Sequence, residues 1–186
     1  MEKSIIEHIA IFIFRKLQYT KIMAANMRQP RHFLFANITK RLMRFGNLEM
    51  IPDCVNRLNV NHGDAVVEVG SGNGQAVDEI LLKEPQKVFA FEISKTFLAD
   101  LWSKFNDNPK VEILDQDFGN SERFIGDKSV DKILLINVIY FLSPLEDYLL
   151  EFKRILKPNG SILIAGKFGL ASQMDQSMFT HTNNPQ

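Results

Sequence analysis

Short apolar runs alternate with stretches of helical spacing through most of the chain. In one such stretch, Phe97, Leu98, Leu101 and Phe105 recur at the intervals that place them on one face of a helix. Strands that alternate with helices predict an α/β fold, in which a doubly wound, mostly parallel sheet carries helices on both faces. The strands are predicted at residues 66–69, 87–93, 111–114, 132–136 and 161–165.

The segment between the last two predicted strands reads as an amphipathic helix with a marked start. Ser143 is predicted to cap it, Pro144 to take its first position and Glu146 to complete a capping box. The turn at residues 157–160 is predicted to end the helix and to lead into the last strand. The predicted buried stripe consists of Leu145, Tyr148, Leu149, Phe152, Ile155 and Leu156.

Residues 1–60 are predicted to form an N-terminal helical extension ahead of the domain at residues 61–186. The apolar run at residues 5–14 is short of the roughly 20 residues that a membrane-spanning helix needs, so no span is predicted. No acidic residue lies between His8 and Leu48, whereas basic residues are frequent there. Residues 1–22 are therefore interpreted as a solvated basic helix or as a leader of mitochondrial type, and Met23 offers a later start that would make them dispensable.

Composition narrows the function without naming it. The chain has 186 residues, 45% of them hydrophobic and 24% charged, which suits one soluble domain with a substantial core. The formal net charge is zero, so the bulk charge does not argue for a nucleic-acid partner or an acidic membrane. The single cysteine, Cys54, suits a reducing compartment, and a cytoplasmic location is expected. The four histidines stand far apart in the sequence, so no metal site is expected.

The first strand is followed by three glycines at alternate positions, Gly70, Gly72 and Gly74, and then at once by a helical pattern. A strand, a glycine turn and a helix form a nucleotide-type site, because glycine permits positive φ and lets a ligand approach the backbone. Dinucleotide-binding loops have a different spacing, G-x-G-x-x-G, and Gln75 stands where their last glycine would fall. The loop also lacks the lysine of a P-loop.

With Glu68, the loop reads E-x-G-x-G-x-G and resembles the first motif of class I S-adenosylmethionine-dependent methyltransferases, in particular their small-molecule, type 11-like members. The resemblance implies a Rossmann-like sheet and S-adenosyl-L-methionine as cofactor. It implies that the loop holds the amino-acid arm of the cofactor, and that Glu68 orients the loop or the ammonium group. The turn R-x-L-K-P-x-G at residues 154–160 also resembles the family, in which its role is structural.

Further candidate ligands follow the other predicted strands. Glu92 lies 22 residues beyond Gly70, where an acid can accept hydrogen bonds from both ribose hydroxyls in any nucleotide-binding sheet. The family resemblance assigns adenine recognition to Asp117 and Phe118, with Asp115 as the rival acid. The set of residues expected to bind the cofactor is Glu68, Gly70, Ser71, Gly72, Asn73, Gly74, Glu92, Ile93, Asp117, Phe118 and Asn137.

The run that begins at Asn137 resembles the fourth motif of small-molecule methyltransferases, where the strand end faces the transferred methyl group. The spacing from Asn137 to Tyr140 is similar to the N-P-P-Y of amine-directed methyltransferases, but both prolines are missing, so that chemistry is not assigned. No catalytic base is assigned to Asp117 or Tyr140. The segment 43–47 resembles an N-terminal cap of some family members, although docking of a helix on the sheet explains it almost equally well.

The chain departs from the family after its fifth predicted strand. The full family sheet has two more strands, and nothing after Ala165 reads as a strand. The fifth strand would then be an apolar edge, which favours self-association or a covering partner unless the N-terminal region covers it. We therefore expect a sheet that is truncated, or an edge that a homo-oligomer or a partner covers.

The sequence therefore predicts methyl transfer from S-adenosylmethionine to a small-molecule or lipid-like acceptor. A cofactor-binding protein without catalysis is the alternative, because the missing strands would remove part of an acceptor pocket. A nicotinamide-dependent oxidoreductase is a third possibility. Nucleic acid is not expected as a substrate, and no firm membrane partner is expected.

Overall fold

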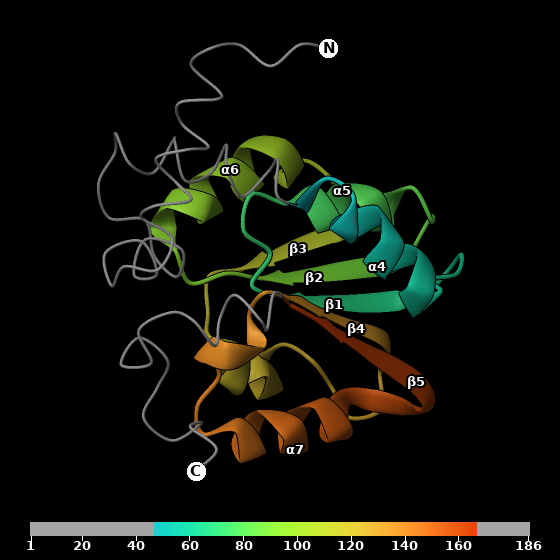
Figure 1. Cartoon of the computed structure of the whole chain (residues 1–186), viewed down its shortest axis with the longest axis vertical. Coiled ribbons are helices and arrows are strands. Elements are labelled where there is room, and N and C mark those ends of the chain that lie inside the picture. The colour runs from blue at the N-terminus through green and yellow to red at the C-terminus, as the bar shows by residue number, and fades with distance from the viewer. Residues whose placement is uncertain (1–46, 167–186) are drawn as a thin grey trace.

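The computed structural model describes residues 47–166. Its centre is a five-stranded parallel sheet in the order β3-β2-β1-β4-β5, which is the α/β architecture that the sequence predicts. The strands are β1 (Ala65–Val69), β2 (Lys87–Phe91), β3 (Val111–Leu114), β4 (Val130–Ile136) and β5 (Leu156–Ala165). Figure 1 shows the sheet between two layers of helices.

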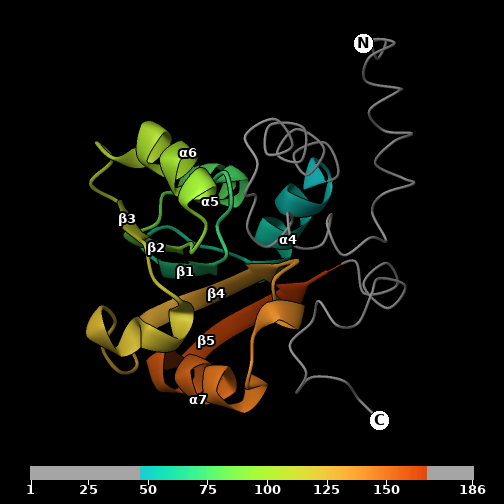
Figure 2. The same cartoon turned by 90° about the vertical axis from the view of Figure 1, so that its left-hand side faces the viewer.

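Helices cover both faces of the sheet, as a parallel sheet requires. Helices α4 (Met50–Leu58), α5 (Gln75–Leu81) and α6 (Lys95–Phe105) lie on one face. The other face carries the 3₁₀ segment η1 (Phe118–Arg123) and α7 (Leu145–Ile155), and Figure 2 shows the two layers from the side. A second 3₁₀ turn, η2 (Ile139–Phe141), lies between β4 and α7.

The core divides at the sheet because residues of one strand point alternately to its two faces. Val66 of β1 packs toward α4, α5 and α6, whereas Val67 and Val69 pack toward η1 and α7. All five residues of β1 are buried, which explains its almost continuous apolar sequence. Glu68 is the exception in this strand, because it carries a carboxyl group into the first of these two cores.

Helix α6 confirms the predicted stripe, because Phe97, Leu98, Leu101 and Phe105 are all buried. The neighbouring Trp102 is 45% exposed.

The start of α7 corrects the predicted capping box. Pro144 is the N-cap residue, with an extended ψ of 138°, and the helix begins at Leu145. Ser143 therefore lies one residue before the cap instead of at it. Leu149 was predicted to be buried on this helix and is 46% exposed, while Tyr148, Phe152 and Ile155 are buried.

Strand β5 is longer than predicted, because the expected turn at residues 157–160 lies within it. Leu156 pairs with Val130, and the next pair joins Ser161 to Lys132, so the register shifts over the turn residues. The predicted turn is therefore an irregularity of the strand. Lys157 of this segment contacts Asp131 of β4, with Nζ 2.7 Å from Oδ2.

Within the part of the chain that the structure describes, β5 is an edge strand of the sheet, as expected. Ile162 and Ile164 are 37% and 39% exposed there. The expectations about the leader, about the basic segment and about further strands after Gly166 lie outside the described residues. No helix in residues 47–166 has both the length and the apolar character to cross a membrane.

Candidate functional site

A pocket of about 1050 Å³, part of it open to solvent, lies at the carboxyl ends of β1, β2 and β4. The strand order reverses between β1 and β4, so this is the switch point at which α/β sheets bind ligands. Ten of the eleven predicted cofactor residues line it. They are Glu68, Gly70, Ser71, Gly72, Asn73, Glu92, Ile93, Asp117, Phe118 and Asn137.

The glycine loop turns sharply after β1. Gly70, Gly72 and Gly74 have φ values of 72°, 56° and 77°, which L-residues with a side chain rarely adopt. The N–H groups of Gly70 and Ser71 both donate to the carbonyl oxygen of Phe91 at 2.9 Å. These bonds fix the start of the loop on the end of β2.

The eleventh predicted residue, Gly74, is not among the residues that line the pocket. A Cβ atom there would lie 2.5 Å from Cε2 of Phe105, so Gly74 is needed for the close packing of the loop against α6. Gly72 differs, because a Cβ at that position would meet nothing within 4 Å. The open space beside Gly72 is where a ligand can approach the backbone.

Glu92 joins two sides of the pocket. Its Oε2 accepts the N–H of Gly72 at 2.8 Å, and its Oε1 accepts the N–H groups of Ile93 at 2.8 Å and Ser94 at 2.7 Å. Burial raises the pKa of Glu92, and these three backbone donors oppose that rise. The carboxylate is thus held at a fixed place, and its remaining lone pairs can accept bonds from hydroxyl groups.

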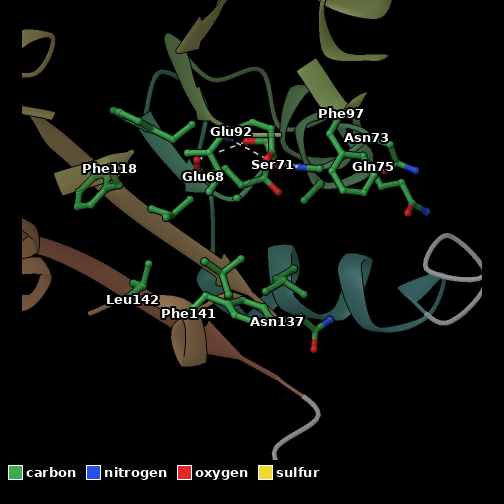
Figure 3. Close-up of a pocket in the computed structure, with 18 of the residues that line it drawn as sticks. Glu68, Ser71, Asn73, Gln75, Glu92, Phe97, Phe118, Asn137, Phe141 and Leu142 are labelled. Atoms are coloured by element: carbon green, nitrogen blue, oxygen red, sulfur yellow. Dashed lines mark hydrogen bonds between the residues drawn. The ribbon is translucent and has the colours of Figure 1, made fainter. Parts of the chain in front are cut away.

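Glu68 is 4% exposed and lines the same pocket. Its Oε2 is buried without a hydrogen-bond partner among the described residues. Burial raises the pKa of Glu68 to about 8, with a smaller opposing effect from the Ser71 hydroxyl and a further rise from the nearby carboxylate of Glu92. Figure 3 shows Glu68, Ser71 and Glu92 close together on one side of the hollow.

Asp117 lines the pocket, whereas the rival acid Asp115 is exposed and does not line it. Oδ1 of Asp117 accepts the Tyr148 hydroxyl at 2.7 Å and the N–H of Gly119 at 2.8 Å. The carboxylate is therefore held in one orientation by η1 and α7.

Phe118 is only 2% exposed and belongs mainly to the core. It packs edge-on against Phe91, with ring centroids 5.2 Å apart, and against Phe152 at 4.8 Å. Its predicted contact with a ligand is therefore limited to the small part that borders the pocket.

Asn137 borders the opposite wall and has a left-handed φ of 58°. Its Oδ1 accepts the Tyr140 hydroxyl at 2.9 Å, and its Nδ2 donates to Oδ1 of Asn47 at 3.4 Å. Asn47, the last residue of the segment that resembles a family cap, also lines the pocket. Residues 43–46 of that predicted cap lie outside the described residues.

Several lining residues lie outside the predicted cofactor set. Val138, Phe141 and Leu142 belong to the run after Asn137 that resembles the fourth family motif. Most of the others are apolar and resemble ordinary core positions in the sequence. Figure 3 shows Phe141 and Leu142 on the same side of the hollow as Asn137. The lining residues outside the predicted cofactor set are Asn47, Ile51, Val69, Gln75, Ala76, Phe91, Phe97, Gln116, Ile136, Val138, Phe141 and Leu142.

The residues present fit S-adenosylmethionine. The unpartnered Oε2 of Glu68 suits a buried cationic group, and the space beside Gly72 suits a ligand that approaches the backbone. Glu92 offers an immobilised carboxylate for two hydroxyl groups, as a ribose requires. Among the described residues, no cluster of side chains could hold a metal ion.

Comparison with known proteins agrees with this fit. A family model described as a methyltransferase domain matches residues 67–164. A ribosomal RNA small subunit methyltransferase A from Persephonella marina is 34% identical over 77 residues, which are 41% of this chain and 28% of the relative. The matched segments span between 27% and 38% of the first three curated relatives.

Solved structures share the fold. A methyltransferase from Haloferax volcanii, in a complex with the activator Trm112, has a TM-score of 0.61 and 24% identity over 76% of this chain and 57% of its own. A SAM-dependent methyltransferase from Aquifex aeolicus has a TM-score of 0.51 and 26% identity over 57% of this chain and 58% of its own. With the domain match and the glycine loop beside the strand-end acids, these likenesses show that the chain belongs to the class I S-adenosylmethionine-dependent methyltransferase family.

Proposed function

We propose that the protein transfers the methyl group of S-adenosylmethionine to a small-molecule or lipid-like acceptor. The observation that carries the proposal is the convergence of Glu68, Gly72, Glu92 and Asp117 on one pocket, from separate segments of the chain. Acidic residues outnumber basic ones in residues 47–166, which supports an acceptor that is not a polyanion.

In this proposal each acid binds one part of the cofactor. Glu92 accepts the two ribose hydroxyls, Glu68 faces the ammonium group, and Asp117 accepts the adenine amino group. The bound cofactor supplies an activated methyl group on a sulfonium. The protein then has to hold an acceptor in line with the S–CH₃ bond, at about 3–3.5 Å, and to exclude water.

The wall opposite the acids supports the lipid-like option. Val138, Phe141 and Leu142 give it an apolar surface, and Asn137 adds one polar group. An apolar body with few polar groups fits such a wall. No general base is assigned, because Asp117 is held by Tyr148 and Gly119, and Tyr140 does not line the pocket.

A second candidate acceptor is RNA. The curated relatives are named ribosomal RNA methyltransferases, and the basic, acid-free stretch between His8 and Leu48 would suit contacts with phosphates. This candidate differs from the first by its salt dependence, because phosphate contacts weaken steeply as salt concentration rises.

The test begins with calorimetry of S-adenosylhomocysteine and S-adenosylmethionine binding to the full chain. A methyl-release assay then compares small amines, phenols and acids, phospholipid vesicles and a small-subunit ribosomal RNA fragment. Turnover on a small or lipid acceptor supports the proposal, and turnover on the RNA alone transfers it to the second candidate. Binding without turnover on any acceptor indicates a non-catalytic protein, and NADH binding without S-adenosylmethionine binding overturns the assignment.

The exposed edge at β5 makes a partner part of the proposal. One solved neighbour forms a complex with an activator protein, and Ile162 and Ile164 are partly exposed on this edge strand. We propose that a second copy or another protein covers it. Light scattering of the purified chain tests self-association. A C-terminal fluorescent fusion tests the proposed cytoplasmic location against the mitochondrial alternative.

A further inference from the structure

Glu68 is a carboxylic acid in the middle of the central strand, with Val67 and Val69 on either side. Its strand neighbours are Ala90 of β2 and Leu134 of β4, neither of which can hydrogen-bond through its side chain. It forms no ion pair with any lysine or arginine of the described residues. A buried acid of this kind is expensive to ionise unless a cation joins it.

The charged groups that act on Glu68 make its ionisation harder. Glu92 follows β2 and Asp78 belongs to α5, and both raise the pKa of Glu68. Asp78 is itself bound by Lys104, with Oδ2 2.9 Å from Nζ. The charged residues Asp53 and Arg57 of α4 are exposed and bind each other, and the residues of β2 and β4 that pair with Glu68 are apolar.

Without a bound cation, these surroundings favour Glu68 as a neutral acid near neutral pH. Its pKa of about 8 agrees with this state. Glu68 lines the pocket, and its Oε2 is buried without a partner among residues 47–166, so these residues leave this acceptor for a ligand.

We propose that Glu68 is a proton-exchange site, which loses its proton to solvent when the α-ammonium group of the cofactor binds. The proposal rests on the proposed use of S-adenosylmethionine. In the exchange, the O–H bond of the carboxyl group breaks, the proton passes to the buffer, and the carboxylate accepts an N–H bond from the ammonium group. No electron is transferred, and the ligand keeps its charge.

Linkage gives the expected consequence. Binding that releases a proton becomes tighter as pH rises, by up to about tenfold per pH unit while Glu68 is protonated, and it levels off above its pKa. An acid that is already ionised in the empty protein would show no such slope. The affinity for the cofactor would thus depend on pH across the physiological range.

Calorimetry can count the proton. We would titrate the full chain with S-adenosylhomocysteine between pH 6 and pH 8.5, where most of the free ligand keeps its α-ammonium group protonated, in pairs of buffers that differ in ionisation enthalpy. The proposal expects release of about one proton at pH 6 and much less at pH 8.5. 5′-Methylthioadenosine, which has the ribose and adenine but no amino-acid arm, serves as the reference ligand. Its binding reports any proton that Glu92 releases, and we expect it to release far fewer protons than the binding of S-adenosylhomocysteine.

The matched variants are Glu68→Gln, which cannot ionise, and Glu112→Gln, which removes an exposed carboxylate paired with Lys87. Glu68→Gln should abolish the proton release. The affinity of Glu68→Gln for S-adenosylhomocysteine should be lower than that of the wild type by about tenfold to a hundredfold at pH 8.5, and by much less at pH 6. Glu112→Gln should behave as the wild type does.

The outcomes separate the two proposals. If neither S-adenosylhomocysteine nor S-adenosylmethionine binds, the proposed function fails. If S-adenosylhomocysteine binds with no net proton release, or if Glu68→Gln keeps the wild-type pH dependence, the proton-exchange inference fails while the function stands. A carboxyl carbon signal of Glu68 in NMR spectra gives an independent reading on the wild-type protein, because it should titrate in the empty pocket and lie at the ionised position in the complex.

Discussion

The carboxylate of Glu92 accepts the backbone N–H of Gly72 at 2.8 Å and so joins the end of β2 to the loop that follows β1. The two residues are 20 positions apart in the sequence. The bond fixes the loop before any ligand arrives. A site that is already in place avoids the entropy cost of ordering it on binding.

Removal of this carboxylate should therefore lower the affinity for the cofactor for two reasons. Glu92→Ala loses the acceptor for ribose hydroxyls and frees Gly72, so we expect an affinity for S-adenosylhomocysteine lower by about a hundredfold. Glu92→Gln keeps two acceptor lone pairs and should lie between this variant and the wild type. Calorimetry measures both, with Glu112→Ala as the control for loss of a surface carboxylate. Equal affinity in Glu92→Ala and the wild type would contradict the assignment.

Three of the four described glycines with positive φ, at residues 63, 72 and 74, offer a graded comparison. Ala at Gly63 or Gly72 meets nothing within 4 Å, so it should cost only the left-handed backbone penalty of about 1–2 kcal/mol. Ala at Gly74 also meets Phe105 at 2.5 Å, which should add about 1–3 kcal/mol. Urea unfolding tests this order.

Ligand binding should rank the same glycine variants differently. Gly72→Ala places a methyl group where the ligand approaches and should lose affinity, whereas Gly63→Ala lies away from the pocket and should bind normally. A Gly72→Ala protein with normal affinity would argue against close approach of the cofactor to this backbone.

The stability of the empty protein should depend on Glu68. The pKa of this group is about 8 when folded and returns to its ordinary value near 4.5 when unfolded. Between these values the folded state binds more protons, so the free energy of unfolding falls as pH rises, by at most about 1.4 kcal/mol per unit. Glu68→Gln lacks this effect. Urea unfolding of both proteins from pH 5 to pH 8.5 should show them diverge, and parallel curves would mean that Glu68 is not a neutral buried acid.

The strand-end acids could be predicted from the sequence because the geometry of a parallel sheet is general. Carboxyl ends of neighbouring strands share one edge, so Glu92 and Asp117 had to lie near the glycine loop once the strands were placed. The same reasoning could not separate Gly72 from Gly74. In the sequence they are equivalent, and only the packing of Phe105 on Gly74 distinguishes them.

The apolar half of the pocket could be predicted only in outline, from the resemblance of the run after Asn137 to the fourth family motif. Taken singly, Val138 and Leu142 resemble core residues, and the space that they border depends on how η2 turns after β4. The capping pattern at Ser143 misled for a local reason, since the extended conformation of Pro144 moves the helix start to Leu145. Residue patterns predict helices and strands well. The lining of a pocket that forms between them can be described only from the tertiary structure.

Whether Asp117 or Asp115 binds the adenine amino group can be tested by a change in ligand specificity. In Asp117→Asn the amide oxygen can still accept the bonds from Tyr148 and Gly119, so stability should change by less than about 1 kcal/mol. The amide nitrogen would then take the place of the second carboxylate oxygen. A donor there would oppose the amino group of adenine.

The affinity of Asp117→Asn for S-adenosylhomocysteine should therefore fall about tenfold to a hundredfold. S-inosylhomocysteine has a carbonyl oxygen in place of that amino group. Its affinity for Asp117→Asn, relative to the wild type, should fall much less than that of S-adenosylhomocysteine. Asp115→Asn, at an exposed position outside the pocket, should leave both affinities unchanged. Calorimetry with the two ligands gives the comparison. The opposite result, in which Asp115→Asn changes the preference between the two ligands and Asp117→Asn does not, would mean that Asp115 binds the adenine amino group. The adenine ring would then lie farther out along the edge of the sheet.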